Sequence, residues 1–290
     1  MLAGDERMLE IMRRSRAAGA DVVSFAGAPG ADTASGSAPA ASLEEALTGT
    51  DVIICPVPGL GPDDSLWTPN AATPVKLTTE TLSLAHAGCA MFMGRVSPGI
   101  EQIAAGTGVE PIAHGDDDVE ALLHAVPTAE GAVRHAIDLS DITIMGSYCV
   151  CTGFGRVGQS MAWLLQGMGA RVMLCARNPS QRARANGFGL QSRPLDALAE
   201  ELERADFVFQ SAPGADGYVL TRELLGHVRK DAVLIELSSP PSGTDLEAAE
   251  QLGLTAVWAR GQAGSAPRTA GFNEWQVIER LYLERVEAAV

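Results

Sequence analysis

The chain has 290 residues, of which 46% are hydrophobic and 20% are charged, and its formal net charge is −15. This length allows two domains of ordinary size, and the acidic balance argues against nucleic acids and anionic membranes as partners. The sequence has no apolar run near the roughly 18 residues that span a bilayer and no signal-peptide pattern, so we expect a cytoplasmic protein.

The first half of the chain alternates between helical and strand patterns. Met8, Leu9 and Met12 share one face of a helix predicted over 5–18, whereas the small residues of 26–41 indicate a mobile linker. Alternation with short connections indicates an open, mostly parallel sheet. The other predicted elements are strands at 21–25, 52–55, 89–93 and 110–113 and helices at 42–48, 79–87 and 98–106.

A helical bridge is predicted between the two halves. Asp116, Asp117 and Asp118 precede it, and three acids in this position suit the positive end of a helix dipole better than a metal ion. Pro127 is typical of a helix's first turn. We therefore expect the bridging helix to begin near Pro127 and to run through Ile137.

Residues 149–177 contain the most informative motif. A short apolar run leads into Gly153-Phe-Gly155-Arg-Val-Gly158, and an amphipathic helix and a second apolar run follow. In a dinucleotide-binding βαβ unit, Gly153 permits the tight turn, Gly155 lets the backbone approach a pyrophosphate, and Gly158 lets helix and strand pack closely. The helix N-terminus would direct its N–H groups at the phosphates.

The end of the second strand in this unit indicates which dinucleotide binds. An NAD enzyme usually places Asp or Glu there to hold the ribose 2′-OH. This chain has Arg177-Asn178 instead, followed by Arg182 and Arg184. A guanidinium suits a 2′-phosphate, so we predict NADP rather than NAD.

The second half continues as alternating strands and helices, and a last helix with an apolar stripe is predicted from Phe272 onward. We expect that helix to pack on the first domain or to form an oligomer contact. The predicted fold is α/β, with two Rossmann-like, doubly wound parallel-sheet domains over 1–138 and 139–271, a helical bridge, and a C-terminal helix over 272–290. The predicted strands are 148–152, 171–176, 206–210, 232–237 and 254–258, and the helices are 155–168, 179–187, 194–203, 221–227 and 244–252.

The five cysteines fall mostly within apparent strands and form no C-x-x-C pair. We expect buried, reduced thiols and no metal site, since no matching His or Cys pair accompanies them. They are Cys55, Cys89, Cys149, Cys151 and Cys175.

Six segments together resemble the A subunit of bacterial dipicolinate synthase over nearly the full length. They are Gly4-Asp5-Glu6-Arg7 with Leu9-Glu10, Pro127–Gly131, Gly153–Gly158, Ala176-Arg177, Gly243–Asp245 and Ala266–Gly271. The resemblance implies NADP-dependent oxidation of a dihydrodipicolinate-type precursor to pyridine-2,6-dicarboxylate (dipicolinate), a compound of bacterial spores. It also implies a separate flavoprotein-like B subunit. The chain departs from the expected pattern at Pro240, where a basic residue is expected, and at His124, where Asn is expected.

Ligands of open α/β sheets bind beyond the carboxyl ends of the strands, which selects the residues expected to hold the cofactor. The loops that follow the predicted strands at 206–210 and 232–237 should lie near the nicotinamide and its ribose. The expected cofactor-binding residues are Thr152, Gly153, Phe154, Gly155, Arg156, Val157, Gly158, Arg177, Asn178, Arg182, Ser211, Ala212, Pro213, Leu237 and Ser238.

A dicarboxylate substrate needs cationic partners, and hydride removal needs a base for the accompanying proton. The candidate substrate-binding residues are Arg7, Arg95, Arg260 and Arg268. The candidate catalytic residues are Glu130 with the neighbouring Thr128, and Asp5, and His124 is a further candidate base. We expect these segments to bound a cleft between the domains.

Two other functions are compatible with parts of the sequence. A D-2-hydroxyacid dehydrogenase or adenosylhomocysteinase-like enzyme shares this domain order, but the hydroxyacid enzymes depend on a histidine after the nucleotide domain, and the last histidine here is His227. A non-catalytic, NADP-binding regulator is the alternative from another class. We expect the protein to form a homo-oligomer.

Overall fold

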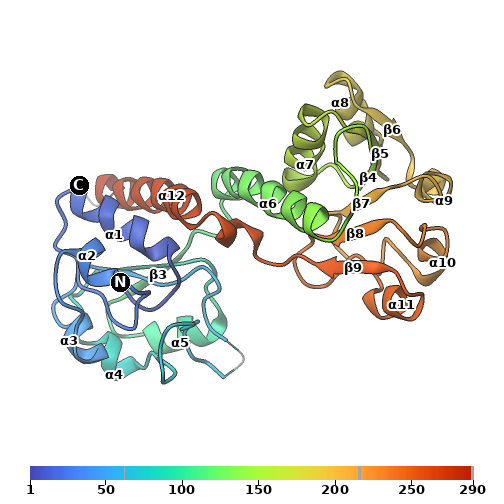
Figure 1. The fold of residues 1–290 in the computed structure, drawn as a ribbon. Coiled ribbons are helices and arrows are strands. Elements are labelled where there is room, and N and C mark those ends of the chain that lie inside the picture. The colour runs from blue at the N-terminus through green and yellow to red at the C-terminus, as the bar shows by residue number, and fades with distance from the viewer. Residues whose placement is uncertain (62, 215–216, 289–290) are drawn as a thin grey trace. The chain divides into compact units, whose positions relative to one another are not determined.

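Two compact units make up the chain, and each contains its own parallel sheet (Figure 1). Unit 1 comprises Met1–Leu123 and Ala266–Val290, and unit 2 comprises His124–Ser265. The two sheets confirm the predicted α/β fold with two parallel-sheet domains. The computed structural model describes residues 1–61, 63–214 and 217–288.

The units divide at positions that differ from the expected boundaries after residues 138 and 271. Helix α6 (Asp118–Asp138) begins in unit 1 and continues in unit 2, whereas helix α12 (Pro267–Ala288) belongs wholly to unit 1. One continuous helix therefore leads from the first unit into the second. The C-terminal helix joins the same unit as the N-terminus.

The sheet of unit 1 has the strand order β1-β2-β3, and both of its strand pairs are parallel. The backbone near the N-terminus extends it, because the Leu2 N–H donates to the Ile54 carbonyl at 3.0 Å. Phe25 forms a single bridge to Leu2, so the strand predicted over 21–25 is wrong. The strands are β1 (Val52–Ile54), β2 (Ala90–Met93) and β3 (Glu110–Ala113).

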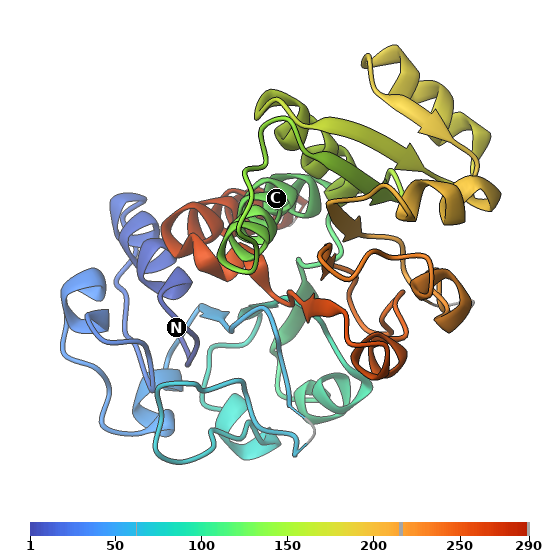
Figure 2. The same ribbon diagram turned by 45° about the vertical axis from the view of Figure 1, so that its right-hand side comes forward.

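Helices cover both faces of this sheet. They are α1 (Arg7–Ala17), α2 (Ala31–Ser35), α3 (Leu43–Leu47), α4 (Thr79–Leu82), α5 (Pro98–Ala104) and α12. Met8 and Ile11 of α1 and Ile278 of α12 join one core cluster with Ile54 and Phe92. The alternate strand residues join a second cluster with α3, α4 and α5. Helices α1 and α12 lie side by side (Figure 1 and Figure 2).

The segment 26–41 is not the linker that its composition indicates. It contains α2, whose Ala31 and Ala34 are buried in the same core cluster as α1. The Ser37 hydroxyl donates to the Val22 carbonyl at 2.8 Å, which ties the segment to the chain before it. Small side chains let this helix pack closely, and they do not by themselves imply mobility.

The sheet of unit 2 has six parallel strands in the order β6-β5-β4-β7-β8-β9. The predicted strand at 148–152 and the predicted helix at 179–187 are confirmed, whereas the short polar strand β6 was missed. The strands are β4 (Tyr148–Thr152), β5 (Arg171–Cys175), β6 (Gln191–Arg193), β7 (Phe207–Gln210), β8 (Val233–Glu236) and β9 (Thr255–Trp258). The helices after α6 are α7 (Arg156–Gly167), α8 (Pro179–Gly187), α9 (Leu198–Leu202), α10 (Arg222–Leu225) and α11 (Leu246–Gln251).

Two core clusters lie on the two faces of this sheet. Residues of α6, α7 and α8 pack against one set of strand side chains that includes Cys151 and Phe209. Residues of α9, α10 and α11 pack against the alternate set, which includes Val150 and Val208. Alternation along β4 and β7 therefore sends successive side chains into different cores, as in a doubly wound sheet.

The bridging helix begins earlier than predicted. Asp117 Oδ1 accepts from the Val119 and Glu120 N–H groups at 2.9 and 3.3 Å, so the helix begins beside the predicted acidic cluster. Pro127 lies inside α6, and its predicted place in a first turn is wrong. An interior proline lacks one backbone donor, yet α6 continues beyond it to Asp138.

All five cysteines are free and buried. Burial raises the pKa of the Cys149 thiol to about 11 and that of Cys55 to about 12, so these thiols are protonated at neutral pH. Within the described residues, no helix combines the length and apolar character that a membrane span requires.

Candidate functional site

The turn between β4 and α7 has the geometry of a dinucleotide-binding turn. Gly153 has φ +82°, a conformation that glycine adopts without strain. A Cβ on Gly158 would lie 2.4 Å from the Gly153 carbonyl oxygen, so helix and turn are in close backbone contact there. A Cβ on Gly155 would have no heavy atom within 4 Å. The turn thus has the tight bend at Gly153 and the close helix packing at Gly158 that the sequence predicts, and it leaves open space at Gly155.

Helix α7 presents an N-terminus that suits a phosphate. Gly155 is its N-cap and supplies no side chain to satisfy the first-turn N–H groups. The Gln159 side chain donates to the Phe154 and Gly155 carbonyls at 3.3 and 3.2 Å, which holds the turn in place. Open space beside Gly155 and an uncapped helix N-terminus together fit a pyrophosphate.

The segment after β5 carries the arginines expected to meet the cofactor's ribose. Arg177 is exposed, and Asn178 caps α8 by accepting from the Ser180 N–H at 2.8 Å. Arg182 Nη1 donates to the Ala176 and Arg177 carbonyls at 2.7 and 2.8 Å. Arg182 therefore shapes this loop, while the Arg177 side chain is exposed beside it.

Gln210, at the end of β7, organises the loop predicted to cover the nicotinamide ribose. Its Oε1 accepts from Thr152 Oγ1 at 2.5 Å and from the Ala212 N–H at 2.7 Å, and its Nε2 donates to the Ala212 carbonyl at 2.6 Å. Ser211 Oγ donates to the Thr152 carbonyl at 2.9 Å. A fully buried amide therefore ties the carboxyl ends of β4 and β7 together.

Glu236, at the end of β8, orders the loop that follows it in the same way as Gln210. Its buried Oε1 accepts from the Ser238 N–H and hydroxyl at 2.7 and 2.5 Å, and its Oε2 accepts from Thr244 Oγ1. Ser238 Oγ in turn accepts from the Gly243 N–H at 3.1 Å. The sequence interpretation missed Gln210 and Glu236, although a polar residue ending an apolar strand just before a site loop was a visible signal.

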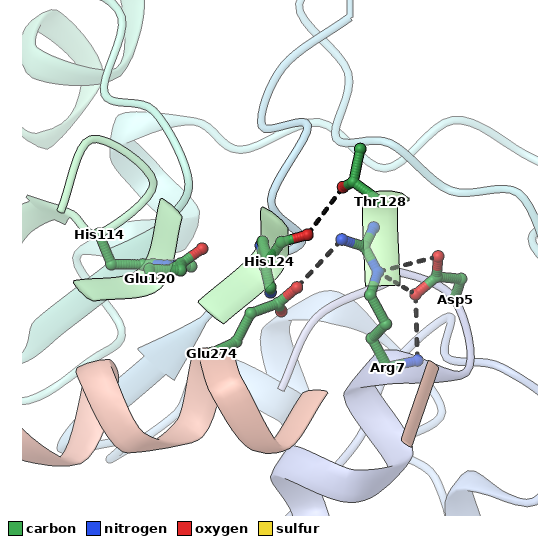
Figure 3. A network of polar contacts seen from close by, with 7 residues as sticks. All are labelled: Asp5, Arg7, His114, Glu120, His124, Thr128 and Glu274. Atoms are coloured by element: carbon green, nitrogen blue, oxygen red, sulfur yellow. Dashed lines mark hydrogen bonds and ion pairs between the residues drawn. The ribbon is translucent and has the colours of Figure 1, made fainter. Parts of the chain in front are cut away.

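Unit 1 places Asp5 and Arg7 in direct contact. Arg7 Nε donates to Asp5 Oδ1 and Oδ2 at 2.9 and 3.1 Å, and its Nη1 donates to Glu274 Oε1 at 3.0 Å. Figure 3 shows the guanidinium between the two carboxylates. The Arg7 Cζ lies over the Trp67 ring, 5.9 Å from its centroid. Glu274, on α12, was missed because an apolar helical stripe surrounds it in the sequence.

His114 and Glu120 form a second buried polar pair in unit 1 (Figure 3). His114 follows β3, and its Nδ1 lies 2.6 Å from Glu120 Oε2, with both side chains at most 2% exposed. His114 Nε2 is one of two buried side-chain polar atoms without a hydrogen-bond partner among the described residues. Such an atom is a place where a further polar group could bind.

The remaining candidate residues have more exposed positions. Arg95 is exposed, and Arg268 is 86% exposed and 3.9 Å from Glu10 Oε2. Arg260 lies over the Trp258 ring of its own unit at 4.9 Å. Glu130 is exposed on α6, and Thr128 Oγ1 donates to the His124 carbonyl at 2.7 Å. Of the predicted substrate and catalytic residues, the structure thus brings Asp5 and Arg7 together.

Among the residues that the structure describes, no group of three or more His, Cys, Asp or Glu side chains is arranged so that it could hold a metal ion.

The fold and the turn define a class of protein. A family model described as the NAD binding domain of D-isomer specific 2-hydroxyacid dehydrogenases matches residues 121–240. Together with the open space at Gly155, this match identifies an oxidoreductase that depends on a nicotinamide dinucleotide, NAD or NADP.

The particular family follows from the whole chain. The model described as the N-terminal domain of the dipicolinate synthase A subunit matches residues 1–114. The A subunit of dipicolinate synthase from Bacillus subtilis (strain 168) is 30% identical over 286 residues, 98% of this chain and 95% of that protein. The chain belongs to the family of dipicolinate synthase A subunits, which confirms the resemblance seen in the sequence.

Solved structures of this family share the fold. The A chain of dipicolinate synthase from Bacillus subtilis has a TM-score of 0.86 at 29% identity, over 100% of this chain and 96% of that chain. The A subunit of the synthase from Bacillus halodurans has a TM-score of 0.83 at 26% identity, over 97% of this chain and 96% of that chain.

Proposed function

We propose that this protein oxidises a dihydrodipicolinate-type precursor to pyridine-2,6-dicarboxylate with NADP as the hydride acceptor. The observation that carries the proposal is the relatedness to the dipicolinate synthase A subunit over nearly the whole of both chains. The nucleotide turn of unit 2 and the Arg7 cluster of unit 1 supply the two kinds of binding group that such a reaction needs.

The reaction removes a hydride and a proton from a dihydropyridine ring, and the ring becomes aromatic. A bound nicotinamide would supply the hydride acceptor. The protein's part is to hold the cofactor, to orient a planar diacid, and to accept the proton. Gly153 to Gly158 would hold the pyrophosphate, and the loops organised by Gln210 and Glu236 would bound the nicotinamide.

Substrate recognition is proposed to begin at Arg7. A guanidinium pairs well with a carboxylate, and Asp5 and Glu274 fix this one in orientation. Arg95, Arg260 and Arg268 are the proposed further cations. Asp5 forms an ion pair with Arg7 and is therefore already engaged. We propose Glu130, near Thr128, as the carboxylate that accepts the proton.

NADP is proposed over NAD because of Arg177. The residue follows β5, where NAD enzymes usually have an acid, and its exposed guanidinium can pair with a 2′-phosphate. We further propose that a B subunit is its partner, since the relative's name describes one subunit of a synthase. We also propose that the protein forms a homo-oligomer and that it is located in the cytoplasm.

The direct test supplies purified protein with dihydrodipicolinate and NADP. Pyridine-2,6-dicarboxylate and NADPH should form in equal amounts, followed by ultraviolet absorbance and chromatography, and the Gly155→Val protein should form neither. Parallel reactions with 2-hydroxy acids test the dehydrogenase alternative. Turnover of a hydroxy acid, with dihydrodipicolinate left unchanged both with and without a B subunit, would refute the proposal.

A further inference from the structure

Unit 1 buries a group of ionisable side chains around Glu274. The group has more members than are needed to orient the Arg7 guanidinium toward a substrate. Glu274 of α12 is 2% exposed, and it faces Arg7 and Asp5 at the start of α1. His114 after β3 and Glu120 of α6 also interact with it electrostatically. Three other parts of the unit thus place ionisable groups around one carboxyl group.

The protonation state of Glu274 determines the net charge that an approaching anion would meet. Arg7 contributes one positive charge and Asp5 one negative charge, so an ionised Glu274 makes this trio net negative and a protonated one makes it neutral. Burial raises the pKa of Glu274 to about 7, although Arg7 and His114 act to lower it. Glu120 and Asp5, being like charges, add to the increase.

Arg7 retains binding capacity while it is held in this way. Its Nε serves Asp5 and its Nη1 serves Glu274, and the side chain is 11% exposed. Among the described residues, Nη2 has no hydrogen-bond partner, and a guanidinium has five N–H donors in all. A carboxylate could therefore bind Arg7 without displacing either acid. His114 Nε2, buried and unpartnered among those residues, offers a second polar atom in the same cluster.

We propose that binding of a substrate carboxylate to Arg7 is accompanied by the uptake of one proton, and that Glu274 is the group that takes up this proton. Glu274 is then a positioning residue that adjusts the charge around Arg7 to the ligand. This inference rests on the proposed function for its ligand, a pyridine-2,6-dicarboxylate-like dianion. It goes further by predicting that recognition of the anion depends on pH through one named carboxyl group.

The sign of the pH effect follows from linkage. An anion on Arg7 disfavours the ionised form of Glu274, so binding is stronger where Glu274 is already protonated. Affinity should be highest below pH 7 and should fall as the pH rises through the Glu274 pKa of about 7. Between about pH 6 and pH 8.5 we expect Kd to rise by about tenfold. The proton on Glu274 and the anion on Arg7 act as two coupled ligands, and about tenfold is an ordinary size for such a coupling.

The experiment is calorimetric titration of pyridine-2,6-dicarboxylate into the full chain saturated with NADP. It is run across this pH range in two buffers with different ionisation enthalpies. The wild-type protein should take up a proton on binding near neutral pH. Glu274→Gln should bind with a Kd that no longer depends on pH and without that proton uptake. Glu201→Gln is the matched control, because Glu201 is a buried carboxylate on α9 of unit 2 that pairs with Arg193 and accepts from the Tyr148 hydroxyl, and it should keep the wild-type behaviour.

Asp5→Asn provides a second, independent variant. Asp5 raises the Glu274 pKa, so its neutralisation should move the midpoint of the pH dependence to lower pH. A wild-type Kd independent of pH, a pH dependence that persists in Glu274→Gln, or an unshifted midpoint in Asp5→Asn would overturn the inference. Absence of dicarboxylate binding at every pH, in wild type and variants alike, would instead remove the proposed function itself.

Discussion

The three glycines of the nucleotide turn differ in what a side chain would meet at each position. At Gly155 an added Cβ finds open space, whereas at Gly158 it meets the Gly153 carbonyl oxygen at 2.4 Å and Ser211 Oγ at 2.9 Å. Close packing in the fold therefore accounts for glycine at the second position, and we expect a bound ligand to account for it at the first. This difference can be measured because the two substitutions should fail in different ways.

Gly155→Val should leave the protein folded and abolish dinucleotide binding, because the new side chain would fill the space proposed for the pyrophosphate. Gly158→Ala should instead lower the free energy of unfolding by about 1–3 kcal/mol, the usual cost of overpacking. Circular dichroism, urea unfolding and calorimetry with NADP distinguish the two results. Normal NADP affinity in a folded Gly155→Val protein would show that the turn is not a nucleotide site.

Arg177 should determine the preference between the two dinucleotides. We expect NADP to bind at least about tenfold more tightly than NAD, a difference of about 1.4 kcal/mol that one charge-assisted contact can supply. Arg177→Ala should remove the preference by weakening NADP binding and leaving NAD binding unchanged. Arg222→Ala, an exposed arginine on α10 of the same unit, is the control. Equal affinities in the wild-type protein would contradict this assignment.

At the scale of elements, the site loops of unit 2 depend on polar residues that end strands. Gln210 and Glu236 occupy paired positions at the carboxyl ends of β7 and β8, and both are fully buried. Each satisfies its polar atoms through the loop that follows it, so loop conformation and strand position are coupled. A buried polar group with all its partners restricts such a loop to one conformation.

Glu236→Ala should therefore affect both stability and function. It leaves the Ser238 and Thr244 donors without their acceptor, which should lower the free energy of unfolding by about 2 kcal/mol. Because the released loop is expected to bound the nicotinamide, NADP binding should also weaken. Thr244→Val removes only the hydrogen bond to Glu236 Oε2 and should show a smaller effect on both. Wild-type NADP affinity in a destabilised Glu236→Ala protein would place the cofactor away from this loop.

At the scale of the whole molecule, unit 1 is built from both ends of the chain, whereas unit 2 is continuous. Helix α12 contributes Val277 and Ile278 to the buried residues of unit 1 and Glu274 to its ionic cluster. Without α12, the apolar face of α1 would be exposed and Arg7 would lose one of its two acids. The C-terminal helix is therefore part of the core of unit 1.

Truncation after Ser265 should test this organisation. Unit 1 should lose its cooperative structure, while the truncated chain should still bind NADP with nearly wild-type affinity through unit 2. Hydrogen exchange resolved by segment should show rapid exchange in 1–123 and retained protection in the strands of unit 2. Retained protection throughout unit 1 would mean that its sheet is stable without α12.

Local patterns determined much of this protein's architecture. The glycine spacing at 153–158, the apolar strands of unit 2 and the alternation of elements depend on neighbours in sequence, so the nucleotide turn and the fold class could be predicted. The errors at 26–41 and at Pro127 have the opposite cause. At 26–41, Ala31 and Ala34 are buried in a core formed with distant residues. At Pro127, α6 continues because Ala129 and Ala132 beyond the proline are buried in the core of unit 2, so packing overrode a local preference in both cases.

The ionic cluster of unit 1 shows what only tertiary structure could decide. Arg7 and Glu274 are separated by 267 positions in the chain, and neither residue's neighbours indicate that they meet. Their contact exists because α12 returns to α1, and the burial that raises the Glu274 pKa is a property of the packed unit. The sequence by itself determined the fold class and the dinucleotide turn, because these depend on short-range patterns. The charge balance around Arg7 arises from long-range packing, and only the tertiary structure could reveal it.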